Sequence, residues 1–327
     1  MVAPGVKRSH ALALAALVFL LTGVALGPVR RWWQNRDVVE IRARMPERGG
    51  FSPKALTVPA GTPVRLRLVS DDVVHGFAIG GRDAPVVDLY PGKPVEVTLT
   101  FDRPGTYTFY CTRWCGPNHW RMRGTITVEG PVTQESTSPP PPLYVQLGLD
   151  IDAPHWAGAV PQERPRASRG QRWASLLPAD MQSLAYVRTH TPEEAWRALR
   201  ALPEMRDLDD QQVWDLVAYL WRQATRREAL AEGARLYAQQ CAACHGETGR
   251  GDGPFAPQHV AMPDFTDPAW SFGASSALWQ GKVLRGGMGT TMPSWGLIFT
   301  EEQTWAVVDY LWTFSMDLEP GFPAPAP

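Results

Sequence analysis

The four cysteines of the chain fall into two close pairs, Cys111 with Cys115 and Cys241 with Cys244. A disulfide framework usually has scattered cysteines that close long loops, so close pairs followed by a histidine favour metal or haem ligation. The first pair belongs to the string CTRWCGPNHWRM, which ends on Met122 and follows a strand-like segment. Its thiols, histidine and thioether are soft ligands of the kind that suits copper.

A second histidine, His75, stands 36 residues before Cys111 in the strand-like segment VVHGF. A mononuclear blue-copper site needs one cysteine, two histidines and a weak axial methionine, so this set has one cysteine too many. Two cysteines on one loop can bridge two copper ions instead. A disulfide, a structural zinc site and the open, exchangeable site of a copper chaperone are the alternatives for this motif.

Residues 50–130 resemble the cupredoxin domain that carries the dinuclear CuA centre in subunit II of haem-copper oxidases and in nitrous oxide reductase. The resemblance rests on the C-x3-C-x3-H-x2-M string and on the upstream histidine. It implies a mixed-valent copper pair over which one electron is spread. Its implied ligands are two bridging thiolates, two terminal histidines, one weak thioether and one backbone carbonyl: Cys111, Cys115, His75, His119, Met122 and the carbonyl of Arg113. Many members have Glu at the Arg113 position, where it helps to bind magnesium, so no magnesium site is carried over.

The second pair of cysteines forms CAACH at 241–245, the C-x-x-C-H motif of haem c attachment. In that chemistry Cys241 and Cys244 become thioethers to the haem vinyl groups, and His245 is the proximal iron ligand. A helix-like segment precedes the motif and a glycine-rich loop follows it. Residues 228–315 as a whole resemble a small class I cytochrome c.

The resemblance to cytochrome c implies a sixth iron ligand well downstream of the motif. Met292, in the string GTTMPSWG, fits the Met-Pro loop of that family, and His/Met ligation gives a raised reduction potential. Met288 is one alternative. His259 is another and would give bis-histidine ligation with a lower potential. Met262, also followed by proline, lies too close to the haem loop.

An uncharged stretch, ALALAALVFLLTGVALG at 11–27, has basic residues on both sides. At about 1.5 Å per residue it just spans a bilayer core. A cleaved signal peptide is the alternative, with a small-x-small site at 25–27, but Pro28 directly after that site is unfavourable for cleavage. We therefore expect a retained, single-pass anchor in residues 1–36. Because haem c is attached outside the cytoplasm, the redox domains are expected on the periplasmic or extracellular face of the cell membrane.

The pattern of apolar residues changes along the rest of the chain and divides it into two regions joined by a linker. Short alternating segments punctuated by Pro and Gly indicate an all-β domain, followed by a stiff proline-rich linker. The β segments are 55–58, 63–69, 94–101 and 105–111. Apolar residues at helical spacing then indicate an all-α region. The predicted helices are 192–200, 208–224, 226–240 and 301–315. The predicted fold class is multidomain: an N-terminal transmembrane helix, an all-β cupredoxin (a Greek-key sandwich or barrel) and an all-α cytochrome c-like region.

An internal repeat divides the helical region. QQVWDLVAYLW at 211–221 resembles EQTWAVVDYLW at 302–312 at a constant offset of 91 residues, which indicates duplicated units. The first copy has no cysteine and cannot bind haem covalently. The predicted domains are the anchor 1–36, the CuA cupredoxin domain 37–130, the linker 131–144, a degenerate haem-free cytochrome c-like unit 145–225, the cytochrome c domain 226–318 and a tail 319–327.

Composition restricts the function. The net charge of −1 gives no general attraction to nucleic acid, so no nucleic-acid partner is expected. Hydrophobic residues at 44% and charged residues at 20% argue against a largely disordered chain. The copper cluster of nitrous oxide reductase requires many histidines, and seven are too few for the chain to be that enzyme by itself. No complete catalytic site is expected.

A haem c and a CuA centre on one membrane-anchored chain predict an electron-transfer protein. The leading hypothesis is subunit II of a haem-copper oxidase fused to a cytochrome c, a non-catalytic redox subunit. It would take electrons from a soluble donor, such as a cytochrome c or a small copper protein. Haem c and CuA would carry them to the catalytic subunit I in the membrane. The alternatives are the electron-input subunit of a nitric oxide reductase and a free-standing, membrane-anchored electron shuttle.

Overall fold

The computed structural model describes residues 38–81, 86–116, 118–131, 140–256, 261–287 and 292–318. The predicted anchor, most of the predicted linker and the tail lie outside these residues. Within the described residues, no helix combines the length and the apolar character needed to cross a bilayer.

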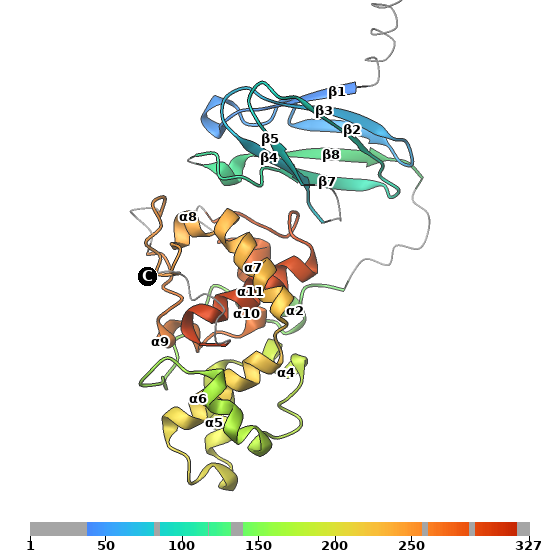
Figure 1. The fold of residues 1–327 in the computed structure, drawn as a ribbon. Helices are drawn as coiled ribbons and strands as arrows, with labels where there is room; N and C mark the ends of the chain where they lie inside the picture. The colour runs from blue at the N-terminus through green and yellow to red at the C-terminus, as the bar shows by residue number, and fades with distance from the viewer. Residues whose placement is uncertain are drawn as a thin grey trace, which may run out of the picture.

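Residues 38–129 form two β-sheets that face one another (Figure 1). One sheet has the order β1-β3-β6 and the other the order β2-β8-β7-β4-β5. The strands are β1 (Val38–Ala43), β2 (Ala55–Pro59), β3 (Val64–Ser70), β4 (His75–Ile79), β5 (Val87–Leu89), β6 (Val95–Leu99), β7 (Gly105–Tyr110) and β8 (Arg123–Glu129). All four predicted β segments are confirmed, and the architecture is the expected β-sandwich.

Alternation along the strands builds the core between the sheets. In β3, Leu66 and Leu68 are fully buried while the arginines between and before them are not. In β8, Ile126 and Val128 point into the same core. Strand β4 differs because all five of its residues are buried, which places His75 inside the protein rather than on its surface. A period of two with one buried face is the pattern expected for such a sheet.

The described residues between 143 and 315 are mainly helical, as predicted. The longer helices are α5 (Pro192–Arg200), α6 (Asp210–Gln223), α7 (Arg227–Gln240), α10 (Ser276–Arg285) and α11 (Glu301–Ser315). The shorter ones are α2 (Leu143–Gln146), α3 (Ala167–Gly170), α4 (Leu184–Thr189), α8 (Ala242–His245) and α9 (Pro268–Ser271). The 3-10 turns are η1 (Pro46–Arg48), η2 (His119–Arg121), η3 (Gln171–Leu176) and η4 (Pro203–Met205).

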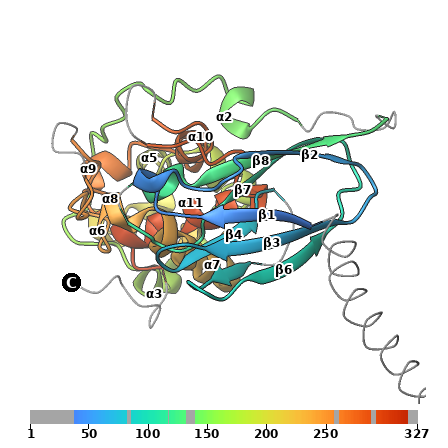
Figure 2. The same cartoon turned by 90° about the horizontal axis from the view of Figure 1, so that it is seen from above.

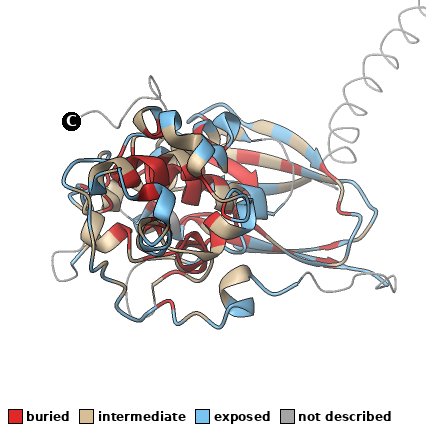
Figure 3. Ribbon diagram, turned by 90° about the horizontal axis from the view of Figure 1, so that it is seen from below, coloured by how far each residue is buried: buried red, intermediate tan, exposed pale blue. Residues whose placement is uncertain are grey.

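The two repeated helices, α6 and α11, begin in the same way. Each has a capping box, Asp209 with Gln212 in α6 and Thr300 with Gln303 in α11, in which the side chains satisfy each other's backbone N–H groups. These pairs also stand 91 residues apart, so the repeat extends to the helix caps. One hydrophobic core runs through both copies, and Trp221 of α6 meets Trp312 of α11 with ring centroids 5.9 Å apart. The buried residues accordingly lie on the inner faces of the helices throughout this region (Figure 3).

The helical region packs against the outer face of the five-stranded sheet, where β4 and β7 pair; Figure 2 shows the same arrangement from above. A small apolar cluster fills this contact, with Ala78 and Tyr110 from the strands and Trp295 and Ile298 from the loop before α11. Two hydrogen bonds join the same surfaces: Gly81 N–H donates to Ile298 O at 3.1 Å, and the Arg123 guanidinium donates to Ser294 O at 2.9 Å. The contact therefore fixes the two regions relative to each other.

Candidate metal and haem sites

The copper-type residues meet at the end of the sandwich that faces the helices. Strand β4 supplies His75, and the loop after β7 supplies the two cysteines, with side-chain atoms of His75, Cys111 and Cys115 within 4.8 Å of one another. His119 Nδ1 lies 3.4 Å from Cys115 Sγ, and Met122 Sδ lies 3.2 Å from the same sulfur. The structure thus brings all five predicted side chains together.

The sixth predicted group, the carbonyl of Arg113, is also at this site. Its oxygen lies 3.2 Å from Cys111 Sγ. The Arg113 guanidinium turns outward and binds Asp88 through two contacts of 2.8 and 2.6 Å. This ion pair holds the exposed side of the loop.

Both histidines turn Nδ1 toward sulfur and Nε2 away from it. His75 Nδ1 lies 3.9 Å from Cys111 Sγ, while its Nε2 is 2.8 Å from Asp72 Oδ1. His119 Nε2 is 3.2 Å from Gln240 Oε1. Because carboxylate and amide oxygens only accept hydrogen bonds, each Nε2 carries the proton and each Nδ1 offers its lone pair to the site. Such outer partners fix the tautomer and the orientation of a metal-binding histidine.

The two thiols behave as one unit. Burial opposes ionisation of Cys111, but interactions with Cys115, His119 and His75 outweigh it and lower the pKa of Cys111 well below its ordinary value. The hydrogen bond with Cys111, together with burial, raises the pKa of Cys115. The first thiolate therefore forms readily, and a metal must displace the second proton. A buried donor set of two sulfurs, two imidazoles and a thioether fits copper.

Close packing around this site limits its access to water. A Cβ at Gly76 would collide with the Thr112 side chain, so only glycine lets β4 approach the cysteine loop. Phe77 packs against Phe51 and Phe109 in the core, which makes it a packing residue. Cys111 is 2% exposed and Cys115 7% exposed, so a metal held between them has little access to water.

The haem-type residues line a cavity of about 680 Å³ in the helical region. Cys241, Cys244 and His245 lie at one wall, where α7 ends and α8 begins. Met292 lines the same cavity, and its own backbone lies so close to Gly286 that a Cβ on that glycine would meet Met292 O at 2.7 Å. His259 and Met288, the alternative ligands, lie outside the described residues. The cavity size suits a large planar cofactor.

His245 has the chemistry of an iron ligand. It is half-buried at the wall of the cavity, and burial lowers the pKa of His245 to about 4, so the imidazole is neutral at physiological pH. Its ring stacks on Phe265 with centroids 5.1 Å apart. Its Nδ1 is buried without a hydrogen-bond partner in the described part of the chain. Burial also raises the pKa of Cys241 to about 12, which keeps that thiol protonated until it reacts.

The two sites adjoin each other across the interface. Gln240, the partner of His119, directly precedes Cys241, and its amide nitrogen also donates to Cys111 O at 3.4 Å. Beside this contact, the rings of Trp114 and Phe255 lie 4.6 Å apart, and Trp114 also faces the His119 ring at 5.4 Å. The copper-type site and the haem-attachment motif are thus separated by one side chain.

Sequence reasoning did not find the outer partners Asp72 and Gln240. Asp72 stands three residues before His75, a spacing that has no recognised motif. Gln240 stands 121 positions from His119, and only the docking of two domains brings them together. Tyr237 and Tyr310 pack against each other and against Phe314.

Comparison with known proteins identifies two domain families along the chain. Residues 11–128 match the cupredoxin-like domain family, and residues 228–311 match the family described as cytochrome c oxidase, cbb3-type, subunit III. Cytochrome c oxidase subunit 2 of Thermus thermophilus is 39% identical over 80 residues, 24% of this chain and 58% of the relative. A second subunit 2, from a named strain of that species, is also 39% identical, over 24% of this chain and 47% of its own length.

The chain therefore spans about half the length of the curated relatives it matches. Among solved structures, a chain of a heme-copper terminal oxidase dimer is 27% identical, with a TM-score of 0.25, over 38% of this chain and 99% of that one. The cytochrome c domain implies haem, and the cupredoxin domain implies copper. This chain combines a cupredoxin-like domain, homologous to cytochrome c oxidase subunit II, with a cbb3-type cytochrome c domain, an arrangement that fits a subunit II fused to a cytochrome c.

Proposed function

We infer that this chain is an electron-transfer subunit that passes electrons from haem c to a dinuclear CuA centre and on to the catalytic subunit of a haem-copper oxidase. Haem c would be held covalently by Cys241 and Cys244, with His245 and Met292 as iron ligands. CuA would be held by the six groups predicted from the sequence: His75, Cys111, the carbonyl of Arg113, Cys115, His119 and Met122.

The hydrogen bond between His119 and Gln240 carries this proposal. It joins a ligand of one centre to the residue adjacent to a covalent attachment point of the other, over 3.2 Å. A second contact, through Trp114 and Phe255, runs beside it. Two centres held this close on one chain exchange electrons without a diffusional encounter. A protein that only delivered copper would have no use for this arrangement.

Bound haem and copper supply one-electron redox chemistry. The haem, held by Cys241, Cys244, His245 and Met292, would donate one electron, and the copper held by the six copper-type groups would accept it. The residues of the chain keep water out, fix both histidine tautomers and hold the ligands in place between redox states. A rigid, dry site of this kind is how a protein tunes a metal centre through its outer shell.

The membrane part of the proposal rests on the sequence. Residues 11–27 would anchor the chain in the cell membrane, with the redox domains on the periplasmic or extracellular face. The catalytic partner would be a haem-copper subunit I in the same membrane, and the donor a soluble cytochrome c or small copper protein. A complex with a catalytic subunit agrees with the homology to oxidase subunit II.

Spectroscopy of the full chain tests this function. The protein would be produced with haem c maturation, loaded with copper and studied by optical and EPR spectroscopy. We expect a multiline mixed-valent copper signal beside a low-spin His/Met haem, and rapid reoxidation of photoreduced haem as copper is reduced. A mononuclear copper signal would refute CuA. Absence of electron exchange between the centres would refute the proposed transfer from haem to copper. Purification from native membranes would then identify the catalytic partner.

A further inference from the structure

The wall of the haem cavity is completed by residues outside the cytochrome c family match. Asp152 to Trp156 line the cavity, although the match begins only at residue 228. These residues belong to the first, cysteine-free copy of the repeat. The haem-free unit therefore contributes directly to the proposed haem site.

Several contacts press this segment, residues 152–157, against the cytochrome helices. Ala157 N–H donates to Ala269 O at 2.7 Å, and a Cβ at Gly273 would collide with the carbonyl oxygen of His155. The His155 ring lies edge-on to Trp270 with centroids 4.9 Å apart. This packing leaves no freedom for the segment to swing away without breaking the α9 contact.

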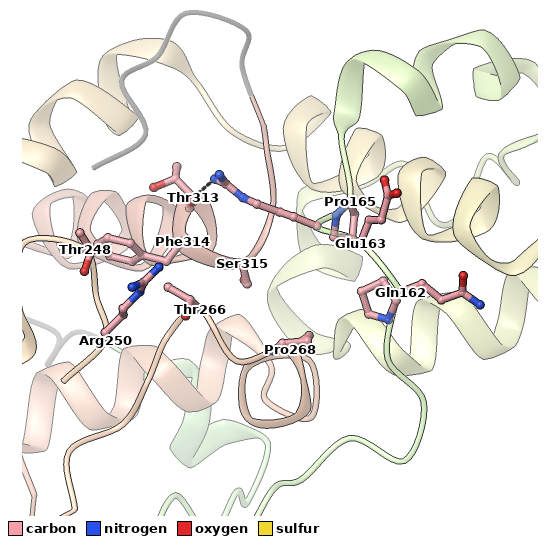
Figure 4. Close-up of a pocket in the computed structure, with 12 residues that line it drawn as sticks. Gln162, Glu163, Pro165, Thr248, Arg250, Thr266, Pro268, Thr313, Phe314 and Ser315 are labelled. Atoms are coloured by element: carbon pink, nitrogen blue, oxygen red, sulfur yellow. Dashed lines mark hydrogen bonds between the residues drawn. The ribbon is translucent and has the colours of Figure 1, made fainter. Parts of the chain in front are cut away.

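Ion pairs fix the N-terminal end of the segment. Asp152 Oδ1 lies 2.9 Å from Lys282 Nζ and 2.5 Å from an Arg285 guanidinium nitrogen, both on α10. Further along, Arg164 donates to the carbonyls of Thr313 and Met316 at the end of α11, beside a cleft of about 530 Å³ (Figure 4). The chain is thus fastened on both sides of His155.

One nitrogen of His155 lacks a partner. Nδ1 lies 3.3 Å from Ala153 O, and a carbonyl only accepts, so Nδ1 carries the proton in this contact. Nε2 is buried and has no hydrogen-bond partner in the described part of the chain. Burial, reinforced by the charge of Lys282, lowers the pKa of His155. A buried polar atom without a partner is costly and calls for a ligand.

Haem c brings two carboxylates to such a cavity. The iron and the vinyl groups are accounted for by Cys241, Cys244, His245 and Met292, and the propionates are the remaining polar groups of the cofactor. Apart from His245, the described side chains that line the cavity and can carry a positive charge are His155 and Lys282. A carboxylate in a largely apolar cavity requires a partner of this kind.

We propose that His155 is a haem-binding residue, whose Nε2 binds a haem propionate. The pair holds one proton: either imidazolium and carboxylate, or imidazole and carboxylic acid. The other titratable groups that line the cavity in the described chain are Asp152, Asp264, Asp267, Tyr237 and Lys282, besides the haem-motif residues. Because the proton on the pair offsets the negative charge of a propionate beside the haem, His155 raises the reduction potential of the iron.

This inference rests on the proposed haem site. Two variants of His155 test the inference separately from that site. His155→Phe removes the hydrogen bond, and His155→Gln keeps an N–H donor but cannot take up the proton. His190→Phe is the matched control, because His190 stacks on Tyr186 and does not line the cavity. Each would be prepared as the full, haem-loaded chain. Haem potential would be measured by spectroelectrochemistry, and the propionates by redox-difference infrared spectroscopy with 13C-labelled carboxylates.

We expect His155→Phe to lower the potential by about 59 mV, a tenfold change in the one-electron equilibrium, and to shift the labelled carboxylate bands. His155→Gln should restore the bands in part, and it replaces the Phe variant if that one does not fold. His190→Phe should match the wild type. Unchanged bands and potential in both His155 variants would overturn the inference. So would a bis-histidine wild-type spectrum that becomes His/Met in both, because His155 would then bind iron. Failure of the wild type to bind haem would instead overturn the proposed function.

Discussion

Asp72 Oδ1 lies 2.8 Å from His75 Nε2, on the side of the ring that faces away from the cysteines. The same carboxylate accepts hydrogen bonds from the backbone N–H groups of Met45 and Val73. Three donors therefore hold Asp72 in place, and Asp72 in turn holds the ring. The direction of the His75 lone pair is set by a residue that does not touch the proposed copper.

Removal of this carboxylate should weaken copper binding. We expect Asp72→Ala to lower copper affinity by about ten- to a hundredfold, the usual effect of losing an outer partner of a metal-binding histidine. Asp72→Asn should retain part of the affinity, because its amide oxygen still accepts from Nε2. Asp71→Ala is the control, since Asp71 pairs with Arg42 and Arg44 at the surface. Competition titration with a copper chelator measures the effect, and equal affinities in all variants would contradict it.

The His119–Gln240 contact should control the rate of transfer between the two centres. We expect Gln240→Leu to slow intramolecular electron transfer by about ten- to a hundredfold, through loss of the coupling and of the fixed His119 ring. Gln239→Leu is the matched control, because Gln239 accepts from Arg235 and does not touch the copper-type site. Flash photoreduction of the haem gives the rate. A Gln240→Leu rate equal to that of Gln239→Leu would exclude this contact as the route.

The sixth ligand can be tested by its effect on potential. Met292→Leu should remove the thioether–iron bond and lower the potential of the haem, because a methionine ligand raises it. Met262→Leu serves as the control, since Met262 also lines the cavity but stands in the loop near the haem motif. Near-infrared and visible spectra report the ligand directly. Loss of the His/Met signature only in the Met262 variant would reverse the assignment.

A buried ion pair joins the haem-free copy to the haem-binding copy. Arg188 of α4 reaches Asp309 of α11 at 2.5 and 3.0 Å and lies over the Trp305 ring, 4.0 Å from its centroid. Burial raises the pKa of Asp309 despite the opposing charge of Arg188. Arg188→Met should lower the free energy of unfolding by about 3–5 kcal/mol, because it leaves a buried carboxylate without its partner.

The double variant Arg188→Met, Asp309→Leu should recover most of that loss, because no charge is then left buried. Arg197→Met is the control, since Arg197 pairs with Glu193 at the surface. Urea unfolding of the full chain gives the free energy of unfolding of the wild type and of the three variants. A single variant as stable as Arg197→Met would mean that the pair does not hold the two copies together.

The Asp152 ion pairs predict a pH effect. Arg285 and Lys282 lower the pKa of Asp152 from 3.8 to about 2. A carboxyl group with a lowered folded-state pKa stabilises the protein above its unfolded pKa and loses this contribution as the pH falls toward the folded one. The stability difference between wild type and Asp152→Asn should therefore be complete above about pH 5 and shrink toward pH 2. Because the pair is largely exposed, we expect less than about 1 kcal/mol. A difference that grows in acid would contradict this assignment.

The parts predicted from the sequence are those encoded in one continuous segment. The loop from Cys111 to Met122 carries four of the copper-type side chains, so its spacing alone describes most of the site. Helices α5, α6, α7 and α11 were found because each keeps a clear apolar stripe or cap. Helix α10 was missed because seven of its ten residues are buried, which leaves little contrast between its faces. Strand β5 has only three residues, too few for a period to show.

What the sequence could not provide is contact between distant segments. Gln240 and His119 belong to separate predicted domains, and the sequence holds no information on how those domains dock. His155 looks like an ordinary loop histidine until Gly273 and Trp270 are seen to hold its backbone and ring against α9. The sequence repeat predicts that the haem-free copy is a separate unit, but its core is continuous with that of the second copy.

The interface between the sandwich and the helices is mainly apolar, with Tyr110 and Ala78 against Trp295 and Ile298. Salt screens charges but does not weaken the burial of apolar surface. A soluble donor that approaches through charged surfaces would slow as ionic strength rises, whereas the internal transfer step would not. The rate of electron transfer from haem to copper would thus stay constant across changes of salt and dilution. Only the rate at which the donor reduces the haem would vary.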